Sequence, residues 1–308
     1  TPMQIATSLF YDRSASKLAS LGSKAELLQT QISSTKRFTA PSDDSVAYQR
    51  LQGLARDTAN DKTYTANLGT AESVLQQGDT SLTAMTDQLQ TVTTLVTQAK
   101  SGTLNAADRK AIGEQIAGIV SSLTAIANAK DARGQALFGG GDGAAAVATD
   151  GSFALAAKPV SGIPIGDGQS VQANETAARI FTVGGKVKPD GSIEGGTNTL
   201  AMLSAIATAL QSDDFKPGSL DTSLADVKAA SDQVTSVQAS LGARAARVDL
   251  ETSRLKDVGT DREATRSGLE DTDITNTVIE LQKTMTILSA TQASFTKLSA
   301  LSLFDYLR

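Results

Sequence analysis

Apolar residues recur at alternating intervals of three and four positions near both ends of the chain, which is the spacing of helices that pack along one narrow stripe. The first stripe consists of Leu18, Leu21, Ala25, Leu28 and Ile32. A longer stripe runs from Leu68 to Ala99, and a third runs from Ile112 to Ile126 behind Asn105, the expected cap of that helix. A helix as long as the second stripe extends about 50 Å at 1.5 Å per residue, so the sequence predicts rods.

The composition of the sequence changes at Phe138. The third helix is expected to extend to that point, because Lys130, Arg133 and Leu137 continue its spacing. From residue 139 to about residue 198 the chain is rich in glycine and in residues that favour strands. Strands are expected at 152–156, 163–165, 169–172 and 179–183. The pair Asp167-Gly168 between two of them is a hairpin signal. The sequence therefore predicts a β-rich insertion with a modest core of its own.

Helical patterns resume after the insertion. One covers residues 200–210, a long one runs from Leu220 to Leu255, and the last begins at Asp273, with Asp271 or Thr272 as its expected cap. The predicted fold class is mainly α with a β-rich insertion: a long antiparallel coiled-coil-like helical rod formed by both chain ends, plus a small β domain. The expected domains are terminal coiled-coil helices at 1–45 and 265–308, a helical rod at 46–138 and 199–264, and an outer insertion at 139–198.

The terminal helices carry apolar stripes that an isolated helix cannot bury. Both ends of the chain therefore have to come together, and neighbouring copies in a polymer can supply further partners through repeating contacts. The residues predicted to form these axial assembly seams are Leu18, Leu21, Leu28, Ile32, Val278, Leu281, Met285, Leu288, Phe295, Leu298 and Leu301.

The composition excludes most enzyme chemistry. The 308 residues include no histidine, cysteine or tryptophan, which removes imidazole bases, thiolate nucleophiles, disulfides and the usual zinc ligands. With 28 basic and 33 acidic residues the net charge is −5, which argues against a nucleic-acid binder. No apolar run reaches the length of a membrane span, and the first residues lack the features of a Sec-type signal. By itself the missing signal points to the cytoplasm.

Three short patterns invite a chemical interpretation, and each has a simpler structural one. Ser42-Asp43-Asp44 offers paired carboxylates, but an acidic helix cap accounts for it better. The glycines at 139–143 lack both the Lys-Ser or Lys-Thr of a phosphate loop and the tandem repeat of a calcium-binding β-helix, which leaves a flexible junction. Asn174-Glu175-Thr176 matches a glycosylation sequon, a pattern that often arises by chance. No catalytic, cofactor-binding or metal site is predicted.

Two questions stay open at this stage. Arg133, Arg244 and Arg247 lie near predicted helix seams, where they either pair with acidic residues or another subunit, or face solvent. The insertion is an alternative place for a ligand-binding module, although it has few aromatic residues with which to line a pocket.

Two motifs lie near the ends of the chain. The N-terminal motif consists of Arg37, Phe38, Pro41, Ser42, Asp43 and Asp44, and the C-terminal motif consists of Leu303, Phe304, Asp305, Tyr306 and Leu307. Both resemble motifs of bacterial flagellar axial proteins, the superfamily of flagellin and FlgL. Thr35 and Ser45 stand where this family commonly has glycine and proline, and the C-terminal motif favours the hook-associated branch. Residues 131–140 and 165–176 are similar to inner segments of that branch, so the resemblance covers nearly the whole chain.

The resemblance implies a structural protein without cofactors. Its expected role is that of a hook–filament junction adaptor, which assembles on the hook-associated protein FlgK, forms an axial polymer and supports filament growth by flagellin. It also implies binding by the export chaperone FlgN, export through the flagellar type III apparatus, and an extracellular location in place of the cytoplasm. Nucleic acid and membrane are not among the expected partners. A flagellin, the bulk filament subunit, is the alternative.

Overall fold

The computed structural model describes residues 2–101, 104–131, 133–141, 143–188 and 193–306, without the side chains at 2–8, 10, 187, 217 and 298–306. The chain divides into two compact units. Unit 1 comprises residues 1–59 and 258–308, and unit 2 comprises residues 60–257. The three domains expected from the sequence, with boundaries near residues 45, 138, 198 and 265, stay a prediction.

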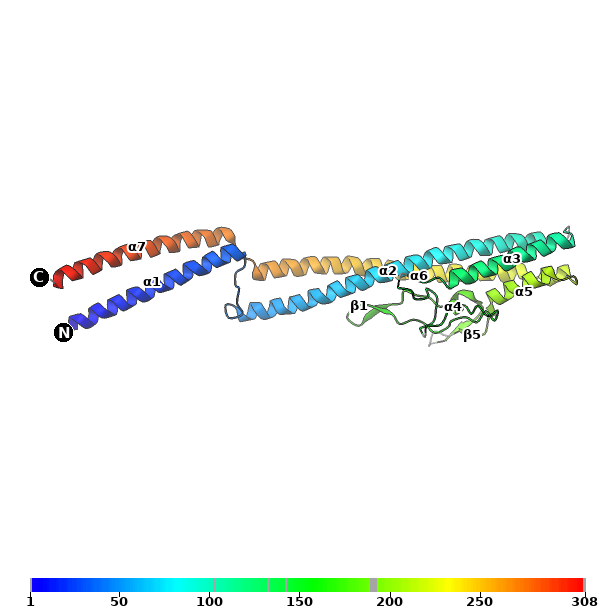
Figure 1. The fold of residues 1–308 in the computed structure, drawn as a ribbon, viewed down its shortest axis with the longest axis horizontal. Helices are drawn as coiled ribbons and strands as arrows, with labels where there is room; N and C mark the ends of the chain where they lie inside the picture. The colour runs from blue at the N-terminus through cyan, green and yellow to red at the C-terminus, as the bar shows by residue number, and fades with distance from the viewer. Residues whose placement is uncertain (1, 102–103, 132, 142, 189–192, 307–308) are drawn as a thin grey trace. The chain divides into compact units, whose positions relative to one another are not determined.

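Unit 1 is built on the two terminal helices, α1 (Pro2–Ser34) and α7 (Ile274–Tyr306), which run antiparallel and side by side (Figure 1). It also holds the start of α2 (Ser45–Lys100) and the end of α6 (Ser223–Glu270). The Nζ of Lys24 lies 2.7 Å from the Oε1 of Glu280, and the rings of Tyr11 and Phe295 meet edge to face with centroids 5.4 Å apart. The two ends of the chain therefore pair, as predicted.

The cap of α7 is Asp273, one or two residues later than the expected Asp271 or Thr272. The Oδ1 of Asp273 accepts the backbone N–H of Asn276 at 3.1 Å. Asp271 accepts the hydroxyl of Ser267, and the hydroxyl of Thr272 shares a 3.2 Å hydrogen bond with that of Thr277. Three adjacent residues can each cap a helix, and only the fold decides which of them does so.

Unit 2 has its core among α2, α3 (Ala106–Ala127), α5 (Thr199–Gln211) and α6, with the 3-10 helix η1 (Pro217–Leu220) between the last two. Buried residues recur every three or four positions along α2 from Leu68 to Ala99, which is the predicted stripe. Asn105 caps α3 by accepting the N–H of Asp108 at 2.8 Å. Helices α3 and α5 approach so closely that a Cβ on Gly113 would lie 2.9 Å from the carbonyl oxygen of Ala207.

Helix α3 ends at Ala127, well before the expected Leu137. The side-chain amide of Asn128 turns the chain into the insertion, because it donates to the carbonyl of Val147 at 2.9 Å and accepts the N–H of Val147 at 3.0 Å. Lys130, Arg133 and Leu137 consequently lie in a loop. A continued helix would have placed two cations on an apolar seam, which is unfavourable without partners.

The insertion contributes three two-stranded antiparallel sheets among the described residues. They pair β1 (Ile163–Gly166) with β2 (Gln169–Val171), β3 (Thr182–Val183) with β6 (Thr197–Asn198), and β4 (Lys186–Val187) with β5 (Ile193–Glu194). The first pair confirms the hairpin predicted at Asp167-Gly168. Gly168 has a φ of +66°, a conformation that glycine adopts without steric cost.

Two of the expected strands were wrong. Residues 152–156 contribute a single bridge, between Val147 and Leu155. Most of the expected strand at 179–183 belongs to a helix, α4 (Ala177–Phe181), which is capped by the Oγ1 of Thr176. The apolar residues of α4 are all buried, so packing against the long helices overrides the β propensity of this segment.

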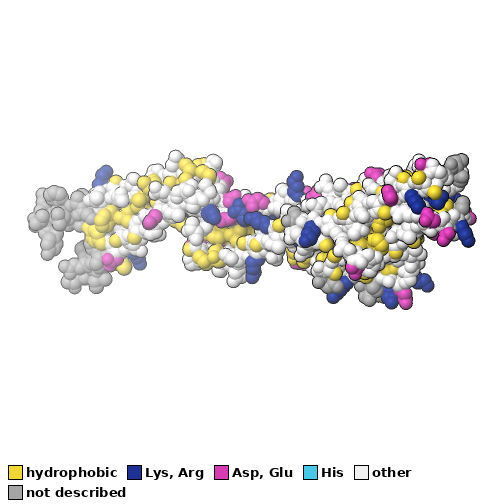
Figure 2. All heavy atoms as spheres, turned by 45° about the vertical axis from the view of Figure 1, so that its right-hand side comes forward, with side chains coloured by type: hydrophobic (Ala, Val, Ile, Leu, Met, Phe, Trp, Pro, Cys, Tyr) yellow, Lys and Arg dark blue, Asp and Glu magenta, His cyan; other side chains and the backbone are white. Residues whose placement is uncertain are grey.

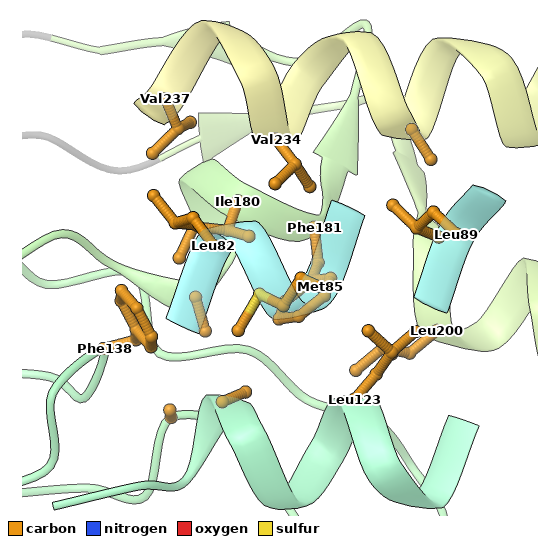
Figure 3. Packing of buried hydrophobic residues seen from close by; sticks show 14 of the residues in the cluster. Leu82, Met85, Leu89, Leu123, Phe138, Ile180, Phe181, Leu200, Val234 and Val237 are labelled. Atoms are coloured by element: carbon orange, nitrogen blue, oxygen red, sulfur yellow. The ribbon is translucent and has the colours of Figure 1, made fainter. Parts of the chain in front are cut away.

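The insertion has no separate core, contrary to expectation. Its buried residues belong to the same cluster as those of the long helices. Figure 3 shows the meeting point of α2, α4 and α6, where the buried side chains are Leu82, Met85, Phe138, Ile180, Phe181, Val234 and Val237. The insertion has too few large apolar residues to form a core that excludes water by itself. Its buried side chains therefore pack against the long helices and complete the core of unit 2.

Candidate assembly surface

The seam between the terminal helices is only partly apolar. Its α1 side consists of Leu18, Leu21, Ala25, Leu28 and Ile32, of which Ala25 and Leu28 are buried and the others half-buried. Its α7 side consists of Thr277, Leu281, Thr284, Leu288 and Phe295, of which the two threonines are buried. The α7 positions follow the four-and-three spacing of a coiled-coil seam. The predicted apolar residues of α1 all lie on it.

Met285 lies beside this seam and not on it. Its exposed fraction is 49%, whereas that of Thr284 is 4%. A helix turns about 100° per residue, so neighbours in sequence face different directions. Apolarity alone selected Met285 because a threonine is usually assigned to a polar face. In a helix, however, the hydroxyl can be satisfied locally, as Thr277 shows by donating to the carbonyl of Asp273 at 2.7 Å.

The other predicted seam residues of α7 divide into two groups. Val278, Leu281, Leu288 and Phe295 are half-buried. Leu298 and Leu301 belong to the last turns of α7, whose side chains lie outside the described part, and so do Leu303 to Tyr306 of the C-terminal motif. Leu307 lies outside the described residues altogether.

Exposed large apolar side chains are concentrated in unit 1. Among the described side chains, seven large apolar residues of unit 1 are exposed, against one of unit 2, Leu250. The seven are Leu9, Leu27, Val46, Ile274, Ile279, Met285 and Ile287. Apolar side chains are accordingly visible along the terminal helices on the face shown in Figure 2. Such a concentration is typical of a surface that binds another protein.

The net charge follows the same division. Unit 1 contains 12 basic and 12 acidic residues, and unit 2 contains 16 basic and 21 acidic residues. Unit 1 therefore carries no net charge, and the whole excess of −5 lies in unit 2. Copies of a neutral, apolar surface can associate without electrostatic repulsion, whereas an acidic surface with little exposed apolar area favours solvation.

The N-terminal motif forms the link between α1 and α2, and its acidic residues are structural. Asp44 caps α2 by accepting the N–H of Ala47 at 2.9 Å. Asp43 closes the turn before it by accepting the N–H groups of Ala40 at 3.0 Å and Thr39 at 3.2 Å. These backbone hydrogen bonds lower the pKa of Asp43. The interpretation of Ser42-Asp43-Asp44 as a helix cap is confirmed, and Pro41 and Ser42 are exposed at the turn.

The rest of the motif ties this link to the one between α6 and α7. The N–H of Arg37 donates to the carbonyl of Glu270 at 2.7 Å. The carboxylate of Glu270 pairs with Lys36 and with Arg266, and these hydrogen bonds hold its pKa below the ordinary value despite burial. Phe38 is buried, with the Arg37 guanidinium 5.6 Å from its ring centre. The motif therefore holds the link between α1 and α2 against the link between α6 and α7.

Two of the three singled-out arginines form ion pairs. Arg244 of α6 donates to the buried carboxylate of Glu175 at 2.6 Å and to the carbonyls of Gln172 and Asn174 at 3.0 and 3.3 Å. It therefore fastens the insertion to α6. Arg133 pairs with Asp131 of its own loop at 2.9 Å. Arg247 is exposed.

The remaining candidate sites carry no reactive arrangement. Asn174 is buried and its amide donates to the carbonyl of Leu137 at 3.1 Å, so the sequon is not accessible. A cavity of about 640 Å³ beside the glycine run is lined mainly by small residues, with Lys130 as its charged side chain. Within the described part of the chain, no group of three acidic residues is placed to hold a metal ion. No described helix is both long and apolar enough to span a membrane.

Comparison with known proteins identifies the family. The bacterial flagellin N-terminal helical region matches residues 5–142, and the bacterial flagellin C-terminal helical region matches residues 224–307. The chain belongs to the flagellin family. The matched regions contain the long helices α2, α3 and α7 and nearly all of α1 and α6, whereas most of the β-rich insertion lies between them. The resemblance inferred from the terminal motifs is confirmed.

Relatives within the family are hook-associated proteins. Flagellar hook-associated protein 3 of Salmonella typhimurium is 26% identical over 320 residues, which cover 98% of this chain and 99% of that protein. The protein of the same name from Escherichia coli is also 26% identical, over 333 residues with the same coverage. By name both are associated with the flagellar hook.

Solved structures share the fold. A putative flagellar hook-associated protein from Vibrio parahaemolyticus matches with a TM-score of 0.65 at 21% identity, covering 74% of this chain and 100% of that one. FlgL of Xanthomonas campestris matches with a TM-score of 0.60 at 17% identity, covering 70% of this chain and 99% of that one. The mainly helical architecture with a small β-rich insertion is therefore that of the family.

Proposed function

We propose that this chain is a structural axial protein of the hook–filament junction. Its similarity to hook-associated protein 3 extends over nearly its whole length. The observation that carries the proposal is the division between its units. Among the described side chains, unit 1 exposes seven large apolar ones and unit 2 exposes one, while unit 1 is neutral and unit 2 is acidic. Such a molecule has one part suited to association and one suited to solvent.

Burial of the exposed apolar side chains of unit 1 provides a driving force for assembly. Burying a leucine-sized side chain contributes about 1.5–3 kcal/mol when it starts fully exposed. Half-exposed residues contribute about half as much, so seven of them provide on the order of 5–10 kcal/mol per copy before the entropic cost of association. Because the exposed residues lie on α1, α2 and α7, each copy can contact several neighbours through heterologous contacts, which generate a polymer.

The partners belong to the same proposal. One end of the assembly contacts the hook-associated protein FlgK and the other receives flagellin, while copies of this chain contact one another laterally. Before assembly the chain is bound by the chaperone FlgN and exported by the flagellar type III apparatus, which places it outside the cell. The family membership and the apolar terminal helices support these assignments.

Electron microscopy of cells that lack this protein tests the proposal. Loss of a junction adaptor leaves hooks without filaments and releases flagellin into the medium. Normal filaments on such cells contradict it. The protein composition of sheared filaments distinguishes this role from the alternative, a bulk filament subunit. A flagellin is the main protein of such filaments, whereas a junction protein is a trace component of them.

A further inference from the structure

We propose that residues 48–67 of α2 and 256–270 of α6 form a bending segment within two otherwise continuous helices. No residue in either stretch is buried. Outside them, α2 buries a residue every three or four positions from Leu68 to Ala99, and α6 does so along much of its length from Ser223 to Leu255. The bending segment is therefore helix without a core.

The composition of the bending segment explains why no core forms. Its apolar side chains, among them Leu51, Leu54, Val258 and Leu269, are only half-buried. Of its 35 residues 12 are charged, against 20% in the whole chain. Helices in proteins are stabilised mainly by the packing of an apolar face, so this stretch depends on local interactions instead.

Three glycines weaken the helices at this place. Gly53, Gly259 and Gly268 lie in helix interiors, and a Cβ on any of them would meet nothing within 4 Å. A close contact therefore does not require glycine there, in contrast to Gly78, where a Cβ would lie 2.8 Å from the Cδ2 of Leu241. Glycine in a helix interior lowers helix stability relative to alanine.

Two strong ion pairs of the segment act along a single helix. Arg266 pairs with Glu263 and with Glu270, both at 2.6 Å and both on α6. One pair between the two helices, Arg262 with Asp57, is long at 3.9 Å. Pairs within one helix support it by a few tenths of a kcal/mol each in isolated helices. Such pairs do not couple the opening of the bending segment to the unfolding of a core.

The lack of buried residues, the open glycines and the high share of charged residues occur together at the boundaries of the compact units. These boundaries lie between residues 59 and 60 and between residues 257 and 258. Segments with few buried contacts open locally at low free energy. The bending segment is therefore expected to open and bend at low free energy while the core of unit 2 persists. The inference rests on burial and helix composition, so it stands or falls independently of the junction role.

Hydrogen exchange of the full-length protein tests the inference. Amides of residues 48–67 and 256–270 are expected to exchange faster than those of residues 68–99 and 223–255, which contribute to the core of unit 2. The triple variant G53A, G259A, G268A should slow exchange in the segment by about fivefold around each site, which corresponds to the helix propensity difference between glycine and alanine. Gly118→Ala and Gly242→Ala are matched controls, because these helix glycines are equally open but lie outside the segment.

The controls should leave exchange in the bending segment unchanged. Two results overturn the inference: segment amides that exchange no faster than those of residues 68–99 and 223–255, or control variants that slow the segment as much as the triple variant does.

Discussion

At the scale of single residues, the link between α1 and α2 holds a strained residue. Thr35 has a φ of +59°, in the left-handed region that costs a residue with a Cβ about 1–2 kcal/mol. Hydrogen bonds hold it there: its carbonyl accepts the N–H of Thr272 at 3.0 Å, and its hydroxyl donates to the carbonyl of Ser34 at 2.7 Å. Glycine adopts this conformation without the steric cost that a Cβ brings.

Replacing Thr35 by glycine should therefore stabilise unit 1. The strain is relieved while the backbone hydrogen bond to Thr272 is kept, so we expect a gain of about 1 kcal/mol in the free energy of unfolding. Thr30→Gly is the matched control, because Thr30 lies inside α1, where the same change should cost a few tenths of a kcal/mol. Urea unfolding followed by circular dichroism measures both, and a loss of stability in Thr35→Gly would refute the strain.

Asp131 makes unit 2 sensitive to acid. Burial raises the pKa of this carboxyl, but hydrogen bonds from the backbone of Gln135 and from the side chain and backbone of Arg133 outweigh burial and leave the pKa below its ordinary value of 3.8. A carboxylate with a lowered pKa contributes its full stability above the unfolded pKa, and the contribution is lost as the pH falls through the folded pKa.

Asp131→Asn should consequently flatten the pH dependence of unfolding. We expect the natural protein to lose more stability than the variant between pH 5 and pH 3, while the variant is the less stable of the two at pH 7. Thermal unfolding across this range measures the difference. Parallel curves for the two proteins would show that Asp131 has no lowered pKa in the folded state.

At the scale of elements, the long helices were predictable and the insertion was not. The stripe from Leu68 to Ala99 repeats over many turns, so its period identifies a helix with little ambiguity. Helix α4 has a single turn, too short to show a period, and its form follows from packing against α2 and α6. The early end of α3 depends on hydrogen bonds between Asn128 and Val147, which no local pattern reveals.

Phe181→Ala tests whether the insertion is part of the unit 2 core. Phe181 is fully buried against the long helices, so its truncation should cost about 3–5 kcal/mol. Leu155→Ala, at a half-buried position of the same insertion, should cost clearly less. The helical signal in urea unfolding is the measurement, because a shared core unfolds with the insertion. An unchanged helical transition in Phe181→Ala would indicate an independent insertion domain.

At the scale of the whole molecule, apolar surface and charge are divided between the two units. The sequence indicates this division only in part. Apolar stripes at both ends predict that these ends associate, and the pairing of α1 with α7 confirms that much. The sequence does not show which apolar residues are left over after pairing, because Thr284 is buried in the seam and its neighbour Met285 is left exposed. Met285 is part of the candidate assembly surface.

The most direct test of assembly through unit 1 compares one substitution at two exposed sites. Ile279 of unit 1 and Leu250 of unit 2 are 58% and 72% exposed, so aspartate at either position should leave the fold intact. Each variant is produced in cells that lack the natural protein, and filaments per cell are counted. Ile279→Asp is expected to abolish most filaments, and Leu250→Asp to restore them. Equal numbers of filaments with the two variants would contradict assembly through unit 1.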